Sequence, residues 1–490
     1  MRKSGILLHI ASLPNDYGIG TFGREAYDFT DLLERSGQSL WQILPLSPTS
    51  YGDSPYQSFS IYAGNPYFIS PDLLKEEGLL ENSDLEGIDW GDKRYIDYAL
   101  LYDKLYGIFR KAYARFKPDA EYAVFTEENP WLKDYALFMA LKNRYSGKPW
   151  NEWDKQLRKR ETDALEKAEK ELAEEIGFHI FLQYEFFKQW ENLRRYAKGK
   201  GVEIIGDIPI YAAYDSVEVW CRPELFMLDD EGTPKYVAGF PPDGFSPDGQ
   251  LWGNPLYNWE NMKKEGYGWW VDRIAFAKKL YDYVRIDHFI GFDRFYAIPY
   301  GSKTAHGGVW FDGPKYELFS AVKERTGKDG IIAEDLGIIT SSVRKLLKQT
   351  GFPGMKILQS AFEPDGSSEY LPQNYSSSNC VVYTSTHDND TVAGWFKAAD
   401  KAHRKFCKEY LGVRKNADVP RAMIELAWKS TAQFALTTIQ ELHGYGSEAR
   451  INTPSTLGNN WRWRALKSDF NDEIVSFLKR LTEISNRNEL

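Results

Sequence analysis

Tyr283-Val-Arg-Ile-Asp-His-Phe289 is a short apolar stretch that carries two opposite charges near its end. Side chains two positions apart lie on the same face of an extended strand, so Arg285 and Asp287 point the same way. Val284 and Ile286 then point to the other face, into apolar packing. An adjacent guanidinium favours the ionised form of a carboxylate, and an ionised aspartate at a strand end can act as a nucleophile. A structural ion pair would give the same pattern, so this stretch alone leaves both interpretations open.

Acidic residues also close three other apolar segments of the chain. These are residues 202–210 with Asp207, residues 330–337 with Glu334, and residues 381–390 with His387 and Asp388. Parallel strands of a barrel carry their chemistry at their C-terminal ends. We therefore expect the four carboxylates to gather at one mouth of such a barrel.

Strand-like and helix-like segments alternate along most of the chain. Helical patterns at residues 24–36, 316–325 and 341–350 lie between strand candidates. The eight candidates are residues 5–11, 39–46, 202–210, the segment from 283, the segment ending at 334, residues 355–361, the segment ending at 388, and residues 433–439. Eightfold alternation is typical of a (β/α)₈ TIM barrel, which we predict as a single catalytic domain over residues 1–490.

Two long segments interrupt the alternation and predict subdomains around the C-terminal face of the barrel. Residues 47–201, between the second and third strands, are partly loop-like and later strongly helical. Residues 211–282 contain a stretch rich in glycine and proline, from Pro241 to Pro255. That composition favours a loop over the active site.

Composition and charge limit the classes of function. The 490 residues carry a net charge of −9 with 16 Trp, 31 Tyr and 28 Phe. A nucleic-acid partner would favour a basic stripe, and a membrane span needs about 18 consecutive apolar residues; the sequence has neither. The aromatic content suits sugar binding, because aromatic faces pack against the apolar faces of sugar rings.

The cysteines and the N-terminus bear on the compartment. Cys221, Cys380 and Cys407 are too few and too scattered for a disulfide framework or a zinc site, which predicts a reducing cytoplasm. The basic start and the apolar run that follows superficially resemble a secretion signal. His9 interrupts that run, and Pro14 follows without a convincing cleavage site, so we favour a first strand.

Eight motifs in order resemble the 4-α-glucanotransferases, also called amylomaltases or disproportionating enzymes, of glycoside hydrolase family 77 in the α-amylase clan. The resemblance runs from Gly5 to about Arg464. The motifs are Ser54-Pro-Tyr, Ala63-Gly-Asn-Pro, Gly206-Asp-Ile-Pro, Trp252-Gly-Asn-Pro-Leu-Tyr, Arg285-Ile-Asp-His-Phe, Ala333-Glu-Asp-Leu-Gly, Thr386-His-Asp-Asn-Asp and Arg450-Ile-Asn-Thr-Pro.

The resemblance implies roles for the acidic residues. Asp287 would be the nucleophile, Glu334 the general acid/base and Asp388 the carboxylate that grips sugar hydroxyls. Arg285 would hold Asp287 ionised, while Glu334 would keep its proton. Asp207 would support the site from the third strand.

The resemblance also implies substrate-binding residues. His387 would bond the donor sugar, and Tyr56 would be a stacking platform. Trp252 would lie on the acceptor side, in a loop that closes and excludes water. Asn254 and His288, which lie in the same motifs, complete the expected binding set. Trp252 could also be a structural loop anchor.

The implied reaction is retaining transfer of α-1,4-glucan segments to the 4-hydroxyl of glucose or another glucan, through a covalent glycosyl-enzyme. Maltooligosaccharides, starch and glycogen-type glucans would be the substrates, with no cofactor, metal, nucleic acid or membrane involved. An α-amylase-like hydrolase is the nearest alternative, because it uses the same three acids with water as acceptor. A non-catalytic glucan-binding protein would not need all three.

Overall fold

Eight parallel strands form one nearly closed sheet in the computed structural model, which describes residues 2–50, 52–242, 246–327 and 329–487. The order across the sheet is β10-β11-β12-β1-β2-β3-β6-β9. The strands are β1 (Lys3–Leu7), β2 (Leu40–Gln42), β3 (Glu203–Ile208), β6 (Tyr283–Ile286), β9 (Ile331–Ala333), β10 (Gly354–Ile357), β11 (Cys380–Tyr383) and β12 (Phe434–Thr438). This is the arrangement of a (β/α)₈ barrel.

The gap between β9 and β10 is bridged by other hydrogen bonds. The amide of Ala333 donates to the carbonyl oxygen of Pro353 at 2.9 Å. Next to it, Oδ1 of Asp335 accepts from the amide of Met355 at 2.7 Å. A side chain at Gly354 would collide with the Asp335 carboxylate, since a Cβ there would lie 2.5 Å from Oδ2. One backbone hydrogen bond and one side chain therefore close the barrel where the regular ladder is missing.

All eight strand candidates are confirmed, but most end earlier than expected; β2 stops at Gln42 and β11 at Tyr383, four and five residues short, and β1 and β10 are each followed by a 3₁₀ turn. β1 stops at Leu7, and residues Ile10–Ser12 form a short 3₁₀ turn. β10 stops at Ile357 and is likewise followed by a 3₁₀ turn. In both places apolar residues continue past the ladder and pack over the end of the barrel. Apolar composition cannot distinguish these two kinds of burial.

The core has two layers. Buried side chains from the strands, including Leu7, Leu40, Ile205, Ile332 and Val381, form one cluster inside the barrel. A larger cluster joins the outer faces of the strands to the surrounding helices. Those helices are α1 (Arg24–Arg35), α11 (Gly268–Leu280), α12 (Lys315–Thr326), α13 (Ser341–Thr350), α14 (Val392–Ala398), α15 (Lys401–Leu411), α16 (Val419–Lys429), α17 (Ile439–His443) and α18 (Asp472–Ile484). The helical patterns expected at 24–36, 316–325 and 341–350 are confirmed.

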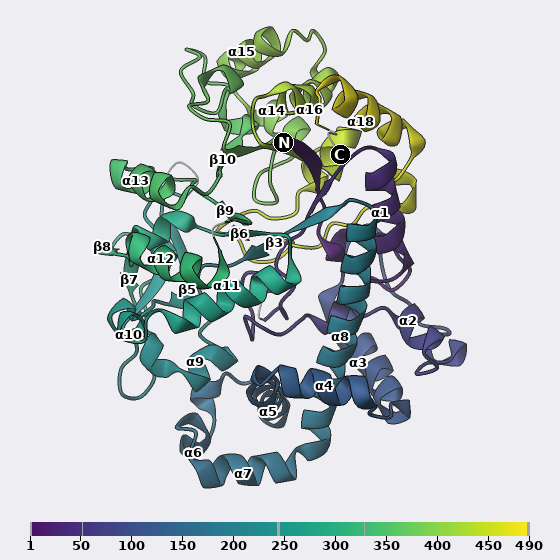
Figure 1. Ribbon diagram of the computed structural model, residues 1–490, viewed down its shortest axis with the longest axis vertical. Helices are drawn as coiled ribbons and strands as arrows, with labels where there is room; N and C mark the ends of the chain where they lie inside the picture. The colour runs from purple at the N-terminus through teal and green to yellow at the C-terminus, as the bar shows by residue number, and fades with distance from the viewer. Residues whose placement is uncertain (1, 51, 243–245, 328, 488–490) are drawn as a thin grey trace.

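Helices dominate the chain between β2 and β3. They are α2 (Pro71–Glu76), α3 (Tyr98–Arg115), α4 (Ala120–Glu128), α5 (Trp131–Arg144), α6 (Lys155–Arg158), α7 (Thr162–Glu171) and α8 (Ala173–Gly199). In Figure 1, α4 to α7 lie at one end of the molecule, and the long helix α8 runs from there back to the barrel. Within the described residues, no helix has the length and apolar character needed to cross a membrane.

A second, antiparallel sheet lies beside the barrel mouth in the order β5-β4-β7-β8. Its strands are β4 (Tyr236–Phe240), β5 (Gln250–Pro255), β7 (Arg294–Pro299) and β8 (Val309–Asp312); α9 (Val217–Cys221) and α10 (Trp259–Lys264) flank β4 and β5 in the chain. The loop expected at 241–255 is therefore wrong for residues 250–255, which form β5; residues 243–245 lie outside the described residues. Gly239 explains the pairing, because it lets the carbonyl of Gln250 approach.

Candidate active site

Arg285 lies at the centre of the site, on β6, with only 2 % of its surface exposed. Nη1 donates to Oδ2 of Asp207 at 2.5 Å and to Oδ1 of Asp287 at 3.3 Å. Nη2 donates to Oε2 of Glu334 at 2.6 Å. The side chains come from three neighbouring strands or their ends, since β3, β6 and β9 are adjacent in the sheet. One guanidinium therefore joins three of the four predicted carboxylates.

The contact expected between Arg285 and Asp287 is present, but it is the longest of the three that Arg285 makes with carboxylates. The pKa of Asp287 is raised well above its ordinary value, first by burial and next by the carboxyl of Glu334. Arg285 opposes both effects, but its closer contacts are to Asp207 and Glu334. A neighbouring carboxyl penalises a second negative charge, so Asp287 takes up a proton more readily than an isolated aspartate does.

The backbone turn after β6 also holds Glu334. The amide of His288 donates to Oε2 of Glu334 at 2.9 Å. His288 has a φ of 48°, in the left-handed region that residues other than glycine rarely adopt. Burial lowers the pKa of the His288 imidazole to about 4, so this ring is neutral at pH 7.

Asp388 lies in a different environment, on the loop that follows β11. Asn452 donates to its Oδ1 at 2.6 Å, and Nε2 of His387 lies 3.2 Å from its Oδ2. Burial alone would raise the pKa of Asp388, but the positive charge that His387 can carry and the hydrogen bonds from His387 and Asn452 lower it. With 39 % of its side chain exposed, Asp388 faces the opening as a carboxylate.

Tyr56 links Asp207 to His387, the residue beside Asp388. Its hydroxyl donates to Oδ2 of Asp207 at 2.8 Å and lies 2.9 Å from Nε2 of His387. The rings of Tyr56 and His387 are stacked, with centroids 5.3 Å apart and planes 12° apart. The structure thus brings seven of the predicted site residues into one network: Tyr56, Asp207, Arg285, Asp287, Glu334, His387 and Asp388.

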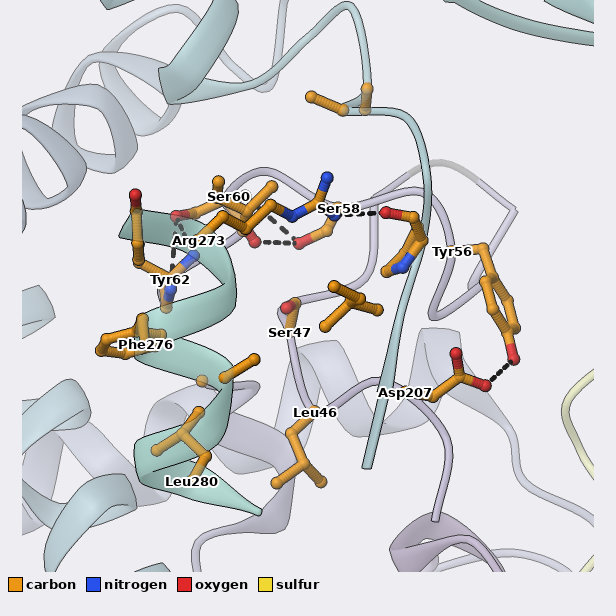
Figure 2. A pocket seen from close by; sticks show the side chains of 18 of the residues that line it. Leu46, Ser47, Tyr56, Ser58, Ser60, Tyr62, Asp207, Arg273, Phe276 and Leu280 are labelled. Carbon is orange, nitrogen blue, oxygen red and sulfur yellow. Dashed lines mark hydrogen bonds between the residues drawn. The ribbon is translucent and has the colours of Figure 1, made fainter. Parts of the chain in front are cut away.

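Tyr56 and Asp207 form part of the wall of a small cavity, whose lining side chains Figure 2 shows. Its volume of about 30 Å³ has room for about two water molecules. Ser47 and helix α11, with Phe276 and Leu280, form other parts of its wall. Oδ1 of Asp207 is buried and has no hydrogen-bond partner among the described protein groups.

Trp252, Asn254 and His288 lie together on the other side of the mouth. The ring centroids of Trp252 and His288 are 4.8 Å apart, at an angle of 84°. Asn254 is buried, with 4 % of its surface exposed, and donates to the carbonyl of Ala212 at 3.0 Å. The side-chain amide of Asn254 is bonded to protein groups, and its expected contact with substrate stays a prediction. Among the described residues, no group of three or more His, Cys, Asp or Glu side chains could hold a metal ion.

The family model of the 4-alpha-glucanotransferases, glycoside hydrolase family 77, matches residues 8–468 of the chain. The chain belongs to this family. The 4-alpha-glucanotransferase of Clostridium butyricum is 50% identical to it over 98% of the chain and 100% of that protein. The enzyme of that name from Thermus thermophilus is 45% identical over 99% of each.

Solved structures of amylomaltases give the same result. The amylomaltase of Streptococcus agalactiae, solved in complex with acarbose, is 44% identical with a TM-score of 0.97, covering 99% of this chain and 100% of that one. The amylomaltase of Corynebacterium glutamicum has a TM-score of 0.77 at 17% identity, covering 99% of this chain and 75% of that one. At that identity the second match is evidence for the fold alone.

In this 4-α-glucanotransferase site, three contacts were missed by sequence reasoning. Asn452 holds Asp388, and Nη2 of Arg450 donates to the backbone carbonyl of Asp388 at 2.9 Å. The motif Arg450-Ile-Asn-Thr-Pro was the available signal, but its partner lies more than 60 positions away. Trp461, which packs against Tyr56 with centroids 5.7 Å apart, lies in no recognised motif.

Proposed function

We propose that the chain transfers segments of α-1,4-glucan to the 4-hydroxyl of glucose or another glucan by a retaining double displacement. Asp287 attacks the anomeric carbon, and Glu334 protonates the leaving oxygen. Glu334 then accepts the proton of the incoming hydroxyl as the glycosyl-enzyme breaks down. Maltooligosaccharides and starch- or glycogen-type glucans are the substrates. A single barrel domain carries out the reaction.

The observation that carries this proposal is the Asp287–Glu334 pair. Both carboxyls are bonded to the same guanidinium, that of Arg285, and the carboxyl of Glu334 is close enough to raise the pKa of Asp287. Retaining glycosidases bring their carboxyls closer together than inverting ones, which leave room for a water molecule between them. The reaction needs one carboxyl as the ionised nucleophile and the other as the acid, and two neighbouring carboxyls penalise a second negative charge.

Asp388 and Trp252 have complementary roles in the proposal. Asp388 stays ionised and faces the opening, so it can accept hydrogen bonds from the hydroxyls of the donor sugar. Trp252 forms a wall on the acceptor side beside His288. Because transfer requires that water be kept from the glycosyl-enzyme, such a wall favours a bound glucan over water. The three free cysteines fit activity in the reducing cytoplasm.

Incubation with maltotriose tests the proposal, with free glucose and oligosaccharide lengths followed together. The wild type should give products longer and shorter than maltotriose, and Asp287→Asn should give neither. Shorter products alone would indicate hydrolysis and contradict transfer. Activity that persists in Asp287→Asn would remove this residue from the nucleophile role.

A further inference from the structure

We propose that Gln57 is a positioning residue that fixes Trp252 and thereby sets the ratio of transfer to hydrolysis. The inference rests on the proposed function, because it assumes that Trp252 forms the acceptor wall. It concerns the support of that wall and does not place Gln57 in contact with substrate.

The side chain of Gln57 makes three hydrogen bonds with β5. Nε2 donates to Oδ1 of Asn254 at 2.8 Å and to the backbone carbonyl of Trp252 at 3.2 Å. Oε1 accepts from Nδ2 of Asn254 at 3.4 Å. Two amides paired in both directions fix each other's orientation, because reversing either one would place donor against donor.

β5 needs this support, because its ladder to β4 is interrupted at Trp252. The register runs from Gly239 opposite Leu251 to Val237 opposite Pro255, so residues 252–254 bulge out of it. Gly253 within the bulge has a φ of 81°, and a Cβ there would meet nothing within 4 Å. Bulges re-aim side chains and leave backbone groups unpaired. Gln57 supplies a partner for the carbonyl of Trp252 where the ladder does not.

Gln57 and its chain neighbour Tyr56 together link the donor side of the site to the acceptor side. Its neighbour Tyr56 bonds to Asp207 and His387, in the carboxylate network. Tyr56 and Gln57 lie in a turn, in which the amide of Gln57 donates to the carbonyl of Ser54 at 3.1 Å. The loop itself is fixed by an antiparallel bridge between Thr49 and Ser58. Adjacent residues of one turn therefore contact the carboxylate network through Tyr56 and β5 through Gln57.

The contacts of Trp252 continue to the acid/base. Its ring abuts His288, whose backbone amide donates to Glu334. Holding Trp252 in place thus keeps an apolar ring against the residue that positions Glu334. The acceptor wall is built in advance by hydrogen bonds, in contrast to the closing loop expected from composition. Loss of the support would admit water to the glycosyl-enzyme and weaken the acceptor site.

The test compares Gln57→Leu with Gln373→Leu, a matched change at an exposed glutamine next to α15. The donor is α-maltosyl fluoride, because fluoride release reports formation of the glycosyl-enzyme. Glucose is the acceptor, and maltose and maltotriose report hydrolysis and transfer. We expect fluoride release within about twofold of wild type. The KM for glucose and the hydrolysed fraction should each rise about five- to tenfold, as the loss of one or two hydrogen bonds predicts. Gln373→Leu should change neither.

Two further variants separate a positioning role from general damage. Gln57→Glu keeps the size of the side chain and its acceptor for Asn254, but it cannot donate to the carbonyl of Trp252. It should behave like Gln57→Leu, with an unchanged melting temperature. In a Trp252→Ala background, Gln57→Leu should add no further change to the ratio, because both act through one ring.

The proposal and the function on which it rests fail in different ways. If Gln57→Leu and Gln57→Glu fold normally and leave the ratio and the KM for glucose unchanged, the positioning role is wrong. An equal fall in fluoride release and transfer would place Gln57 on the donor side and would also reject it. If the wild type makes no transfer product, the proposed function fails whatever the variants do.

Discussion

The carboxylates at the mouth of the barrel fall into two groups with opposite electrostatics. Asp207, Asp287 and Glu334 share one buried guanidinium, and the pKa of Asp287 is raised well above its ordinary value. Asp388 has no guanidinium bonded to its carboxylate among the described residues, yet its pKa is lowered. His387 and Asn452 provide its hydrogen bonds.

This contrast teaches that the number of competing acids matters more than the presence of a cation. Arg285 has three carboxylates to satisfy, and burial penalises each negative charge that it leaves unmatched. Asp388 has two neutral or cationic neighbours of its own and faces solvent. The first group can therefore hold a proton for the reaction, while the second stays charged for binding.

Removing Arg285 should have the largest effect on this contrast. Arg285→Met leaves three carboxylates without their buried counter-charge, so we expect a loss of roughly 3–5 kcal/mol in the free energy of unfolding. Transfer activity should fall by at least about 10³-fold, since three groups lose their positions together. Urea unfolding and maltotriose assays measure both. If Arg285→Met lowers the free energy of unfolding by less than Asn452→Ala does, Arg285 does not have this central role.

Asn452→Ala should damage the second group alone. Asp388 loses one hydrogen bond to its charged form, so its pKa should rise toward the ordinary value. We expect kcat/KM for maltotriose to fall about tenfold, because a hydrogen bond to a charged group contributes about 1.5–3 kcal/mol. The free energy of unfolding should change by less than about 1 kcal/mol for this partly exposed site. Loss of folding cooperativity would show that Asn452 has a wider structural role.

The pH dependence of kcat/KM should distinguish the two groups. Because the pKa of Asp287 is raised, activity should fall on acidification at a pH above the usual range of an aspartate. Asp207→Asn removes a negative charge that raises this pKa and frees Nη1 of Arg285 for Asp287. The acid limb should then move to lower pH. Asn452→Ala serves as the control, and an equal shift there would reject the separation of the groups.

Glu218 gives a third environment, a buried carboxyl that is bonded only to neutral donors. It accepts from the hydroxyl of Ser60 at 2.8 Å and from the amide of Ile61 at 3.0 Å. Burial raises its pKa from 4.5 to about 7. The folded state therefore binds more protons than the unfolded state between these values, and stability falls as pH rises through them.

Glu218→Gln imitates the protonated form and should remove this loss. Its melting temperature should match the wild type near pH 4.5 and exceed it by about 1–2 °C above pH 7, as an effect of about 1–2 kcal/mol would give in a chain of this size. Glu363→Gln, at an exposed surface position, is the control. If the difference in melting temperature between Glu218→Gln and the wild type stays constant across the pH range, folding does not change the pKa of Glu218.

Much of the barrel could be predicted because its strands are apolar runs that end in acids. Alternation with helices gave the number of strands, and the position of Asp207, Asp287 and Glu334 at the strand ends indicated the site. Strand ends were less predictable, since apolar residues such as Ile10 leave the ladder and still become buried. Family motifs supplied Tyr56 and Trp252, which no periodicity marks.

The missed features depend on partners that are distant in the chain. β5 contains glycine and proline, and it forms because Gly239 admits its backbone. Spacing alone paired Arg285 with Asp287, two positions away, whereas its shorter hydrogen bonds are to Asp207 and Glu334 on other strands. Local sequence predicts which groups face the mouth. It does not predict how one cation is divided among them.

Adjacent positions 334 and 335 serve two unrelated requirements. Glu334 faces the mouth of the barrel, while Asp335 bonds to the amide of Met355 at the joint between β9 and β10. Successive side chains of a strand point to opposite faces, which permits this division of labour. Substitutions at positions 335 and 354 are limited by the geometry of the barrel wall. The residue at position 334 is instead determined by its part in the reaction. Libraries aimed at the acid/base should therefore vary position 334 and keep Asp335 and Gly354 fixed.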